Sequence, residues 1–510
     1  MKNYFIQKIF GIFLLTIICC SCKKFLDLKP VSLITTDNAY TTAPNIEAAL
    51  NGAYSSFMGT NYYQWQFIEL SDMHSDNAYN GGSGDATFLP IDLMNIPSDN
   101  NGCIYLSWTE LYASIAKCNA VIDNIVNVTD PALTNTRRTQ IIGEASFLRA
   151  FHYYQLVKQW GGVPIEKHSN STDPSVIRIP RSADTAVYNF IVSDLQVALN
   201  NLPDAYDGAD ASTNKVRATK GAANALLAKV WAQRPDRDYN KVLQYCNAVI
   251  NSPAGYSLMP NYADLFDGNH YLNQESIMEI PYVAGTAQGC WGNELFYPTH
   301  ESDGTIGSYQ WQRYCVPSKT LVNAYEAAGD AVRENAKISF EYVPWTDENW
   351  DACGDPTVKV PFDVMQKHPD NYASGDHVYL LRLADIILLK AEAQNELGDA
   401  GDAAITLNLI RSRVHLPGTT ASSQADLRIA ILKERQLELS FEAQRWDDLV
   451  RSGTAVTVMN SLNEDNYTCN NGTLSTPIPI NYNMTQQKTL LPIPLLELQA
   501  NPNLTQNPGY

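Results

Sequence analysis

The sequence predicts a mostly α-helical fold, in which tetratricopeptide-like helical hairpins stack into an α-α superhelix with an inserted loop-rich ligand-binding portion. Three observations predict it. Apolar residues recur at intervals of three and four along long stretches of the 510-residue chain, which is the spacing of a buried helix face. Turns rich in Gly, Pro and Asp separate these stretches. Small residues on the predicted inner faces would let paired helices approach closely.

The clearest pattern lies between residues 379 and 451. Its first predicted helix has an apolar face formed by Leu380, Leu383, Ile387 and Ala391. Gly398 ends this helix, because glycine tolerates the left-handed backbone of a helix C-terminus, and Asp399 or Asp402 can cap the next one. The second helix presents Ala404, Leu407, Leu409 and Ile410. A single hairpin leaves one face exposed, so we expect other hairpins to pack on it.

Further helices are expected upstream, at residues 37–58, 108–126, 137–160, 184–202, 215–234 and 239–250. Gly161, Gly162 and Pro164 end the third of these. Asn119 lies on the predicted buried face of the second, where an amide is more often satisfied inside the protein than offered to a ligand. Together the segments predict about four tetratricopeptide-like units.

Two regions, residues 59–101 and 251–376, interrupt the helical pattern. Both are rich in Gly, Pro, Asn, Asp and aromatic residues, with short strand-like pieces only at 276–282 and 337–343. Long irregular segments in a compact protein are usually functional or disordered, and the aromatic content argues against disorder. We therefore expect the ligand-binding part of the protein in these regions.

Composition limits the class of ligand. The formal net charge is −18 at pH 7, and no cluster of Lys and Arg offers contacts to phosphates, which argues against nucleic acid. Only 18% of residues are charged, whereas neutral polar residues and tyrosines are plentiful. Such a surface suits neutral, hydroxylated ligands.

The first 21 residues are predicted to be a lipoprotein signal peptide. Lys2 and Lys8 precede a short apolar run, which is too short for the roughly 20 residues that a membrane-spanning helix needs. Cleavage after Ser21 would leave Cys22 as an acylated N-terminal residue. A lipid anchor on Cys22 would then hold the mature protein at a membrane.

Seven cysteines remain in the predicted mature chain: Cys103, Cys118, Cys246, Cys290, Cys315, Cys353 and Cys469. An odd number excludes complete intramolecular pairing, although Cys290 and Cys315 could form a disulfide. The cysteines are widely spaced, with no CxxC pair and no histidine at ligand distance, so we predict no metal site. No nucleotide, zinc-protease or nucleophile motif appears, and no cofactor is expected.

Aromatic and amide side chains in the two irregular regions are the predicted ligand contacts. Sugar rings lie against aromatic faces, and amide groups bind their hydroxyls. The candidates are Tyr63, Trp65, Asn77, Tyr79, Trp291, Tyr309 and Trp311. Glycines flank Trp291 and Trp311, which favours exposure of these two rings. Any of the aromatic side chains could instead fill a small core beneath the loops.

Two sets of ionisable residues could suggest catalysis. His74 lies between Asp72 and Asp76, but such residues in a Gly-rich loop commonly form turns. Glu434, Glu438 and Glu442 recur every four residues, with Arg435, Arg445 and Arg451 three or four positions from acidic residues. This spacing favours helix-surface or interhelical ion pairs over glycosidase carboxylates. We therefore predict no catalytic residue.

Several motifs, taken in order, resemble the SusD/RagB family of outer-membrane nutrient-binding lipoproteins. They are EASFLRAFHYYQLVKQWGGVPI, LRLADIILLKAEAQNELG, LNLIRSR, KERQLELSFEAQRWDDLVR and LLPIPLLELQANPNLTQNPGY. They span both ends of the mature chain. KKFLDLKP at Lys23–Pro30 resembles the leader that follows the lipidated cysteine in such proteins.

The resemblance implies a non-enzymatic protein, lipid-anchored on the outer face of the outer membrane, that captures an oligosaccharide and closes as a lid over a SusC-like TonB-dependent transporter. Two alternatives stay open: a peptide-binding member of the family, or an outer-membrane glycoside hydrolase on a helical scaffold. The predicted parts are a signal peptide (1–21), an N-terminal half (22–250), an aromatic-rich binding portion (251–376) and a C-terminal half with its tail (377–510). The family's binding residues vary between members, so none is transferred to this sequence.

Overall fold

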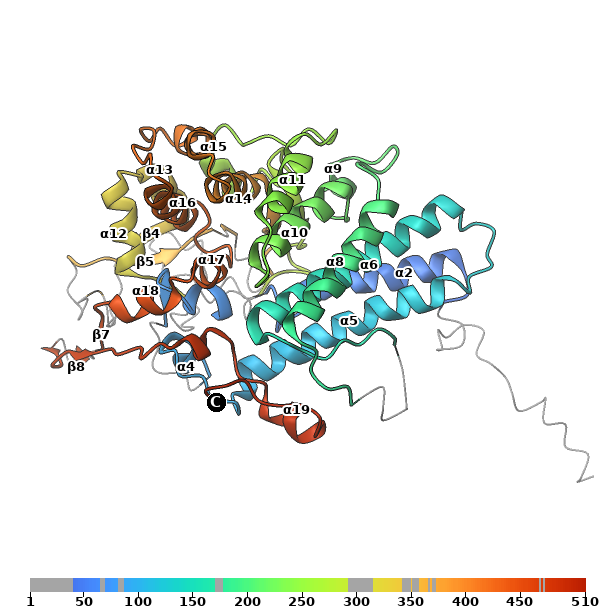
Figure 1. Cartoon of the computed structure of the whole chain (residues 1–510), viewed down its shortest axis with the longest axis horizontal. Helices are drawn as coiled ribbons and strands as arrows, with labels where there is room; N and C mark the ends of the chain where they lie inside the picture. Colours follow the sequence, from blue (N-terminus) through green and yellow to red (C-terminus); the bar gives the residue numbers. More distant parts are fainter. Residues whose placement is uncertain are drawn as a thin grey trace, which may run out of the picture.

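The computed structural model is mostly helical with a few short strands (Figure 1). It describes residues 40–64, 69–80, 87–169, 178–291, 315–341, 350, 357–365, 367–368, 373–466, 469–470 and 473–510. The predicted signal peptide and Cys22 lie outside the described residues. Within the described ranges, no helix is long and apolar enough to cross a bilayer.

The main helices form one array in which each packs against its neighbours along the chain. Its first half contains α2 (Ala43–Tyr54), α5 (Leu106–Ile125), α6 (Asn135–Trp160), α8 (Asp184–Asn201), α10 (Lys220–Gln233) and α11 (Tyr239–Ile250). Its second half contains α14 (Leu383–Glu396), α15 (Ala400–Arg413) and α16 (Gln424–Glu438). Consecutive members of this series are in contact, from α2 against α5 to α15 against α16. The predicted hairpin scaffold is confirmed.

Local sequence explains where these helices begin, end and approach each other. The hydroxyls of Thr134, Thr219 and Ser423 accept hydrogen bonds from backbone N–H groups of the first turns of α6, α10 and α16. Gly398 has a φ of 94° after α14, as a left-handed helix end requires. Small residues let the helices pack closely, because α10 buries Ala222, Ala223, Ala225 and Ala228 completely.

The chain leaves this array after α11 and returns at α14, although these two helices pack on each other. The excursion contains η5 (Tyr262–Leu265), β2 (Ser276–Ile280), β3 (Val316–Pro317), α12 (Lys319–Ala328), α13 (Ala331–Lys337), β4 (Ile338–Glu341) and β5 (Val360–Asp363). We did not predict α12 and α13. The sequence did contain a helix signal for α12, because Ser318 caps its first turn and Leu321, Val322 and Tyr325 form its buried face.

Short elements complete the fold. η2 (Ser55–Met58) follows α2, and the first irregular region holds η3 (Glu69–Met73), β1 (Ala78–Tyr79) and α4 (Leu89–Asp92). η4 (Asn101–Tyr105) leads into α5, and α9 (Ala211–Asn214) precedes α10. After α16 come α17 (Arg445–Ser452), α18 (Ala455–Ser461), β7 (Asp465–Asn466), β8 (Cys469–Asn470), β9 (Thr473–Leu474), β10 (Ile478–Pro479), η7 (Gln486–Thr489) and α19 (Leu495–Ala500).

Two details of the predicted hairpin are wrong. Leu380 belongs to β6 (Val378–Arg382), which pairs antiparallel with β2, so that the helix begins only at Leu383. A short apolar run fits a buried strand as well as a helix, and the partner strand decides. Leu409 is 51% exposed, whereas Ala403, Thr406, Leu407 and Ile410 form the buried face of α15.

Candidate functional site

The two irregular regions form one body, although residues 102–250 separate them in the sequence. β1 pairs antiparallel with β3, with Ala78 opposite Pro317 and Tyr79 opposite Val316. The Ser318 hydroxyl donates to the backbone oxygen of Asp76, and the Ser318 N–H donates to that of Asn77 over 2.9 Å. We call this joined body the loop platform, defined by the described residues of 59–101 and 251–376.

Buried polar contacts fix the loop platform to the helical scaffold at the start of α17. Asp76 receives two hydrogen bonds of 2.7 Å from the guanidinium group of Arg445. The Asp72 carboxylate accepts the backbone N–H groups of Phe441 and Ala443 at 3.1 and 2.7 Å. Asp72 and Asp76 are therefore structural residues, which explains two of the three polar residues around position 74.

The third, His74, is equally structural. It is buried, and its ring centre lies 4.2 Å from that of Trp446. Burial lowers the pKa of His74 to about 3, so the imidazole is neutral at physiological pH. Burial raises the pKa of Asp72 to about 7, against the hydrogen bonds from Ala443, Asn77 and Phe441. A neutral histidine packed under a tryptophan, away from solvent, gives no basis for acid–base catalysis.

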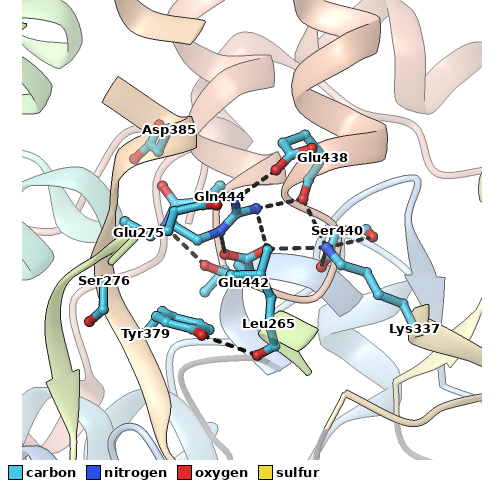
Figure 2. A network of polar contacts seen from close by, with 12 residues as sticks. Leu265, Glu275, Ser276, Lys337, Tyr379, Asp385, Glu438, Ser440, Glu442 and Gln444 are labelled. Atoms are coloured by element: carbon cyan, nitrogen blue, oxygen red, sulfur yellow. Dashed lines mark hydrogen bonds and ion pairs between the residues drawn. The ribbon is translucent and has the colours of Figure 1, made fainter. Parts of the chain in front are cut away.

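A buried network of charged side chains surrounds Glu438 and Glu442 of the motif KERQLELSFEAQRWDDLVR (Figure 2). Glu438 is fully buried and forms ion pairs with Arg333, Arg382 and Arg413. Glu442 pairs with Lys337 at 3.1 Å and with Arg382 at 2.5 Å. Burial alone would raise the pKa of Glu438, but Arg413, Arg382 and Arg333 outweigh this effect and hold it well below its usual range.

The three glutamates form ion pairs with other elements, as one of the two alternatives predicted, and Arg451 pairs with Asp448 at 2.8 Å, but Arg435 and Arg445 are not partners of the glutamates. Arg435 pairs with Asp385 and Asp448, and Arg445 pairs with Asp76, so neither contacts the glutamates. The partners of the glutamates come instead from α13, β6 and α15. Spacing along one helix cannot reveal partners that only the tertiary fold brings close.

Three of the predicted ligand contacts are buried in the loop platform. Tyr63 is 7% exposed and packs against Phe57, Tyr62 and Phe151. Asn77 is fully buried, and its amide oxygen accepts a hydrogen bond from Gln436 at 3.1 Å. Tyr79 is 2% exposed within β1. These side chains support the platform and offer a ligand no open face in this conformation.

Trp291 is the predicted contact that the structure leaves half-buried at the junction of the two irregular regions. Its backbone N–H donates to the side-chain oxygen of Gln64 at 3.4 Å. Cys290 exchanges two backbone hydrogen bonds with Ser374, at 2.8 and 2.9 Å. Gln64 and Ser374 thus hold the backbone that carries the indole, which no local pattern indicated. Trp65, Tyr309 and Trp311 lie outside the described residues.

Five cysteines of the described ranges are buried and form no disulfide: Cys103, Cys118, Cys246, Cys290 and Cys315. The disulfide considered between Cys290 and Cys315 is therefore not formed. Burial raises the pKa of Cys118 to about 12, so this thiol is not activated as a nucleophile.

One group of side chains within the described ranges has metal-ligating atoms close together. Those of Asp264, Asp267 and His270 lie within 4.8 Å of one another. Local turn contacts account for the arrangement, because Asp267 accepts the N–H groups of Asn269 and His270 and the Asp264 carboxylate accepts from Asn261. The group therefore does not by itself indicate a metal site.

One family model matches the N-terminal part of the chain, and another matches its C-terminal part. The model described as "Starch-binding associating with outer membrane" matches residues 24–231. The model described as "SusD family" matches residues 356–510. The first covers most of the N-terminal half of the scaffold, and the second covers α14, α15, α16 and the C-terminal tail.

Individual proteins are similar over nearly the whole chain. SusD-like protein P2 of Formosa agariphila is 27% identical, with 100% of both chains covered. A SusD homolog from Bacteroides thetaiotaomicron has a TM-score of 0.78 at 22% identity, covering 93% of this chain and 98% of its own. A structure named as a laminarin-binding SusD-like protein has a TM-score of 0.72 at 23% identity, covering 92% of this chain and 100% of its own.

Proposed function

The chain belongs to the SusD family, and on this premise we propose that it is a non-enzymatic surface receptor that captures oligosaccharides for uptake. The observation that carries the proposal is the match of both family models, one of which refers to starch binding and to the outer membrane. The similar fold named as laminarin-binding supports a glycan rather than a peptide as the ligand. Cys22 would carry the lipid anchor.

We place the glycan contacts on the loop platform, at Trp291, with Trp65, Tyr309 and Trp311 as further proposed contacts. The platform is suited to this role because buried ion pairs hold it on a rigid scaffold while the Trp291 indole keeps part of its surface. A fixed aromatic side chain binds a sugar ring with little loss of conformational entropy. Few such contacts give modest affinity, which a nearby transporter would offset by high effective concentration.

We further propose that the helical scaffold docks on a SusC-like TonB-dependent transporter, over which the protein closes as a lid. Exposed apolar side chains on the scaffold support a partner surface. Ile405 is 65% exposed on α15, and Ile429 is 69% exposed on α16. A stable lid needs a large interface, and rigid helices supply it at low ordering cost.

Isothermal titration calorimetry of the mature protein tests the ligand class. We expect laminarin or starch oligosaccharides to bind and a peptide mixture to give no heat. Trp291→Ala should weaken glycan binding about fivefold, because an aromatic contact contributes roughly 1 kcal/mol. Tyr510→Ala, which removes an exposed aromatic ring at the C-terminus, is the matched control and should bind as wild type. Binding of peptides alone, or release of reducing sugar from a bound glycan, would overturn the proposal.

A further inference from the structure

A pocket that we call the tail pocket lies where the C-terminal tail meets the N-terminal helices, and none of the described glycan candidates lines it. Its volume is about 370 Å³. The first turns of α5 supply Trp108 and Tyr112, the segment after α6 supplies Glu166, and α19 supplies Glu497. Figure 1 shows α19 beside the start of α5. Three distant parts of the chain therefore build this pocket.

The walls of the pocket are held rigidly. The Trp160 indole N–H donates to the backbone oxygen of Pro492 at 3.0 Å. Arg181 donates to the backbone oxygens of Gly162 and Thr505 at 2.6 and 2.9 Å, joining the segment after α6 to the tail. The Asn501 amide donates to the oxygen of Ile179 at 2.9 Å. With these bonds in place, the pocket is preformed and needs no ordering step before a ligand enters.

The two carboxylates of the pocket have no cationic partner among the described residues. Each is half-buried, and burial raises the pKa of both; the charge of Glu497 raises that of Glu166 further. The Trp108 side chain hydrogen-bonds to Glu497 and partly opposes the rise in its pKa. Arg178 lies at the rim but is exposed, so solvent screens its charge. Two carboxylates that repel each other are stabilised by a cation placed between them.

The remaining wall suits an organic cation better than a metal ion. The phenol group of Tyr112 donates its proton to the backbone oxygen of Pro164 at 2.9 Å, which fixes the ring within the pocket. The face of an aromatic ring attracts ammonium groups. Metal ions prefer a compact set of oxygen ligands, whereas this pocket has room for a six-membered ring and pairs its carboxylates with aromatic groups.

We propose that this pocket binds a small molecule bearing an ammonium group, with Glu166 and Glu497 as the anionic contacts and Tyr112 as the aromatic wall. An amino sugar and a lysine side chain share this chemistry. Trp291, the proposed glycan contact that the structure describes, does not line this pocket, so the test does not depend on glycan capture. It would let the protein take a charged ligand that the loop platform, with its neutral aromatic contacts, does not select.

Calorimetry with ligands of matched size tests the proposal on the intact mature protein. Cyclohexylammonium should bind, whereas cyclohexanol, which has the same ring without the charge, should not. Glu497→Gln and Glu166→Gln should each weaken cyclohexylammonium binding at least tenfold without lowering the melting temperature. Glu326→Gln, the same change at an exposed position on α12, is the control and should leave binding unchanged.

Comparing D-glucosamine with Nα-acetyl-lysine methylamide then identifies the source of the ammonium group, and tighter binding of either supports the proposal. Equal binding of cyclohexylammonium and cyclohexanol would overturn it. So would undetectable amine binding, or amine binding that neither glutamate variant weakens. Retained binding of glycans by the variants would show that the loop platform is intact, so a negative result here leaves the proposed function standing.

Discussion

Burial acts in the same direction on Glu438 and on the tail-pocket carboxylates Glu166 and Glu497, but their different partners leave their pKa values shifted in opposite directions. Glu438 is surrounded by three guanidinium groups that lower its pKa, whereas Glu166 and Glu497 have no described cationic partner and have raised pKa values. A buried carboxylate with partners is part of the structure, and removing it leaves other charges unpaired. A half-buried carboxylate that faces a cavity without a partner is available to a ligand.

The ion-pair network around Glu438 also shows how the scaffold supports the loop platform. The network joins α13 and β6 of the excursion to α15 and α16 of the second half of the helical array. The buried ion pair between Asp76 and Arg445 joins the loop platform to the scaffold in the same way. Buried ion pairs need accurate geometry to offset desolvation, so they hold these elements in one arrangement. The loops that we propose as the glycan site therefore stand on a fixed base.

The largest expected effect is that of Glu438→Gln. The substitution removes the negative charge that three guanidinium groups share, and we expect it to lower the free energy of unfolding by about 3–5 kcal/mol. Thermal and urea unfolding measure the loss. Glu396→Gln is the matched control, because Glu396 pairs with Arg428, which is 51% exposed, and should change stability by less than about 1 kcal/mol. Similar effects of the two substitutions would contradict a structural role for the network.

Lowering the pH should weaken the same network and destabilise the protein, by less than Glu438→Gln does. Despite burial, Arg413, Arg382 and Arg333 lower the pKa of Glu438, while Lys229 and Arg435 lower that of Asp385. Carboxylates of the unfolded chain titrate near pH 4. The stabilisation is therefore complete above about pH 5 and is lost as pH falls toward the folded pKa values. Melting temperatures between pH 7 and pH 3 should fall, and Glu438→Gln should show a shallower decline. A flat profile for wild type would oppose this account.

The helical scaffold was predictable from sequence because its signals are local. Apolar spacing, capping hydroxyls and a glycine such as Gly398 act within a few residues, and the predicted segment 239–250 coincides with α11. The strand β6 was missed because its partner β2 lies far away in the sequence. α12 was missed because the Gly- and Pro-rich surroundings concealed a short amphipathic pattern.

The sites were less predictable, because burial and partners depend on tertiary contacts. Residue type alone indicated Tyr63 and Asn77 as ligand contacts, yet the fold buries both. Nothing in the sequence near Glu166 indicated that Glu497 would face it from the other end of the chain. The ion-pair partner of Asp76 likewise comes from α17, beyond the reach of any local pattern.

The smallest expected effect completes the comparison. Glu497→Gln makes the same chemical change as Glu438→Gln but removes a charge that has no cationic partner among the described residues. The Gln oxygen can still accept the hydrogen bond that Trp108 makes to Glu497, and repulsion with Glu166 disappears. Because solvent screens this half-exposed pair, we expect stability to stay within about 0.5 kcal/mol of wild type, with any change upward. Urea unfolding at pH 7 measures it. A loss as large as that of Glu438→Gln would mean that Glu497 is a structural residue, and that the tail pocket is simply another part of the scaffold.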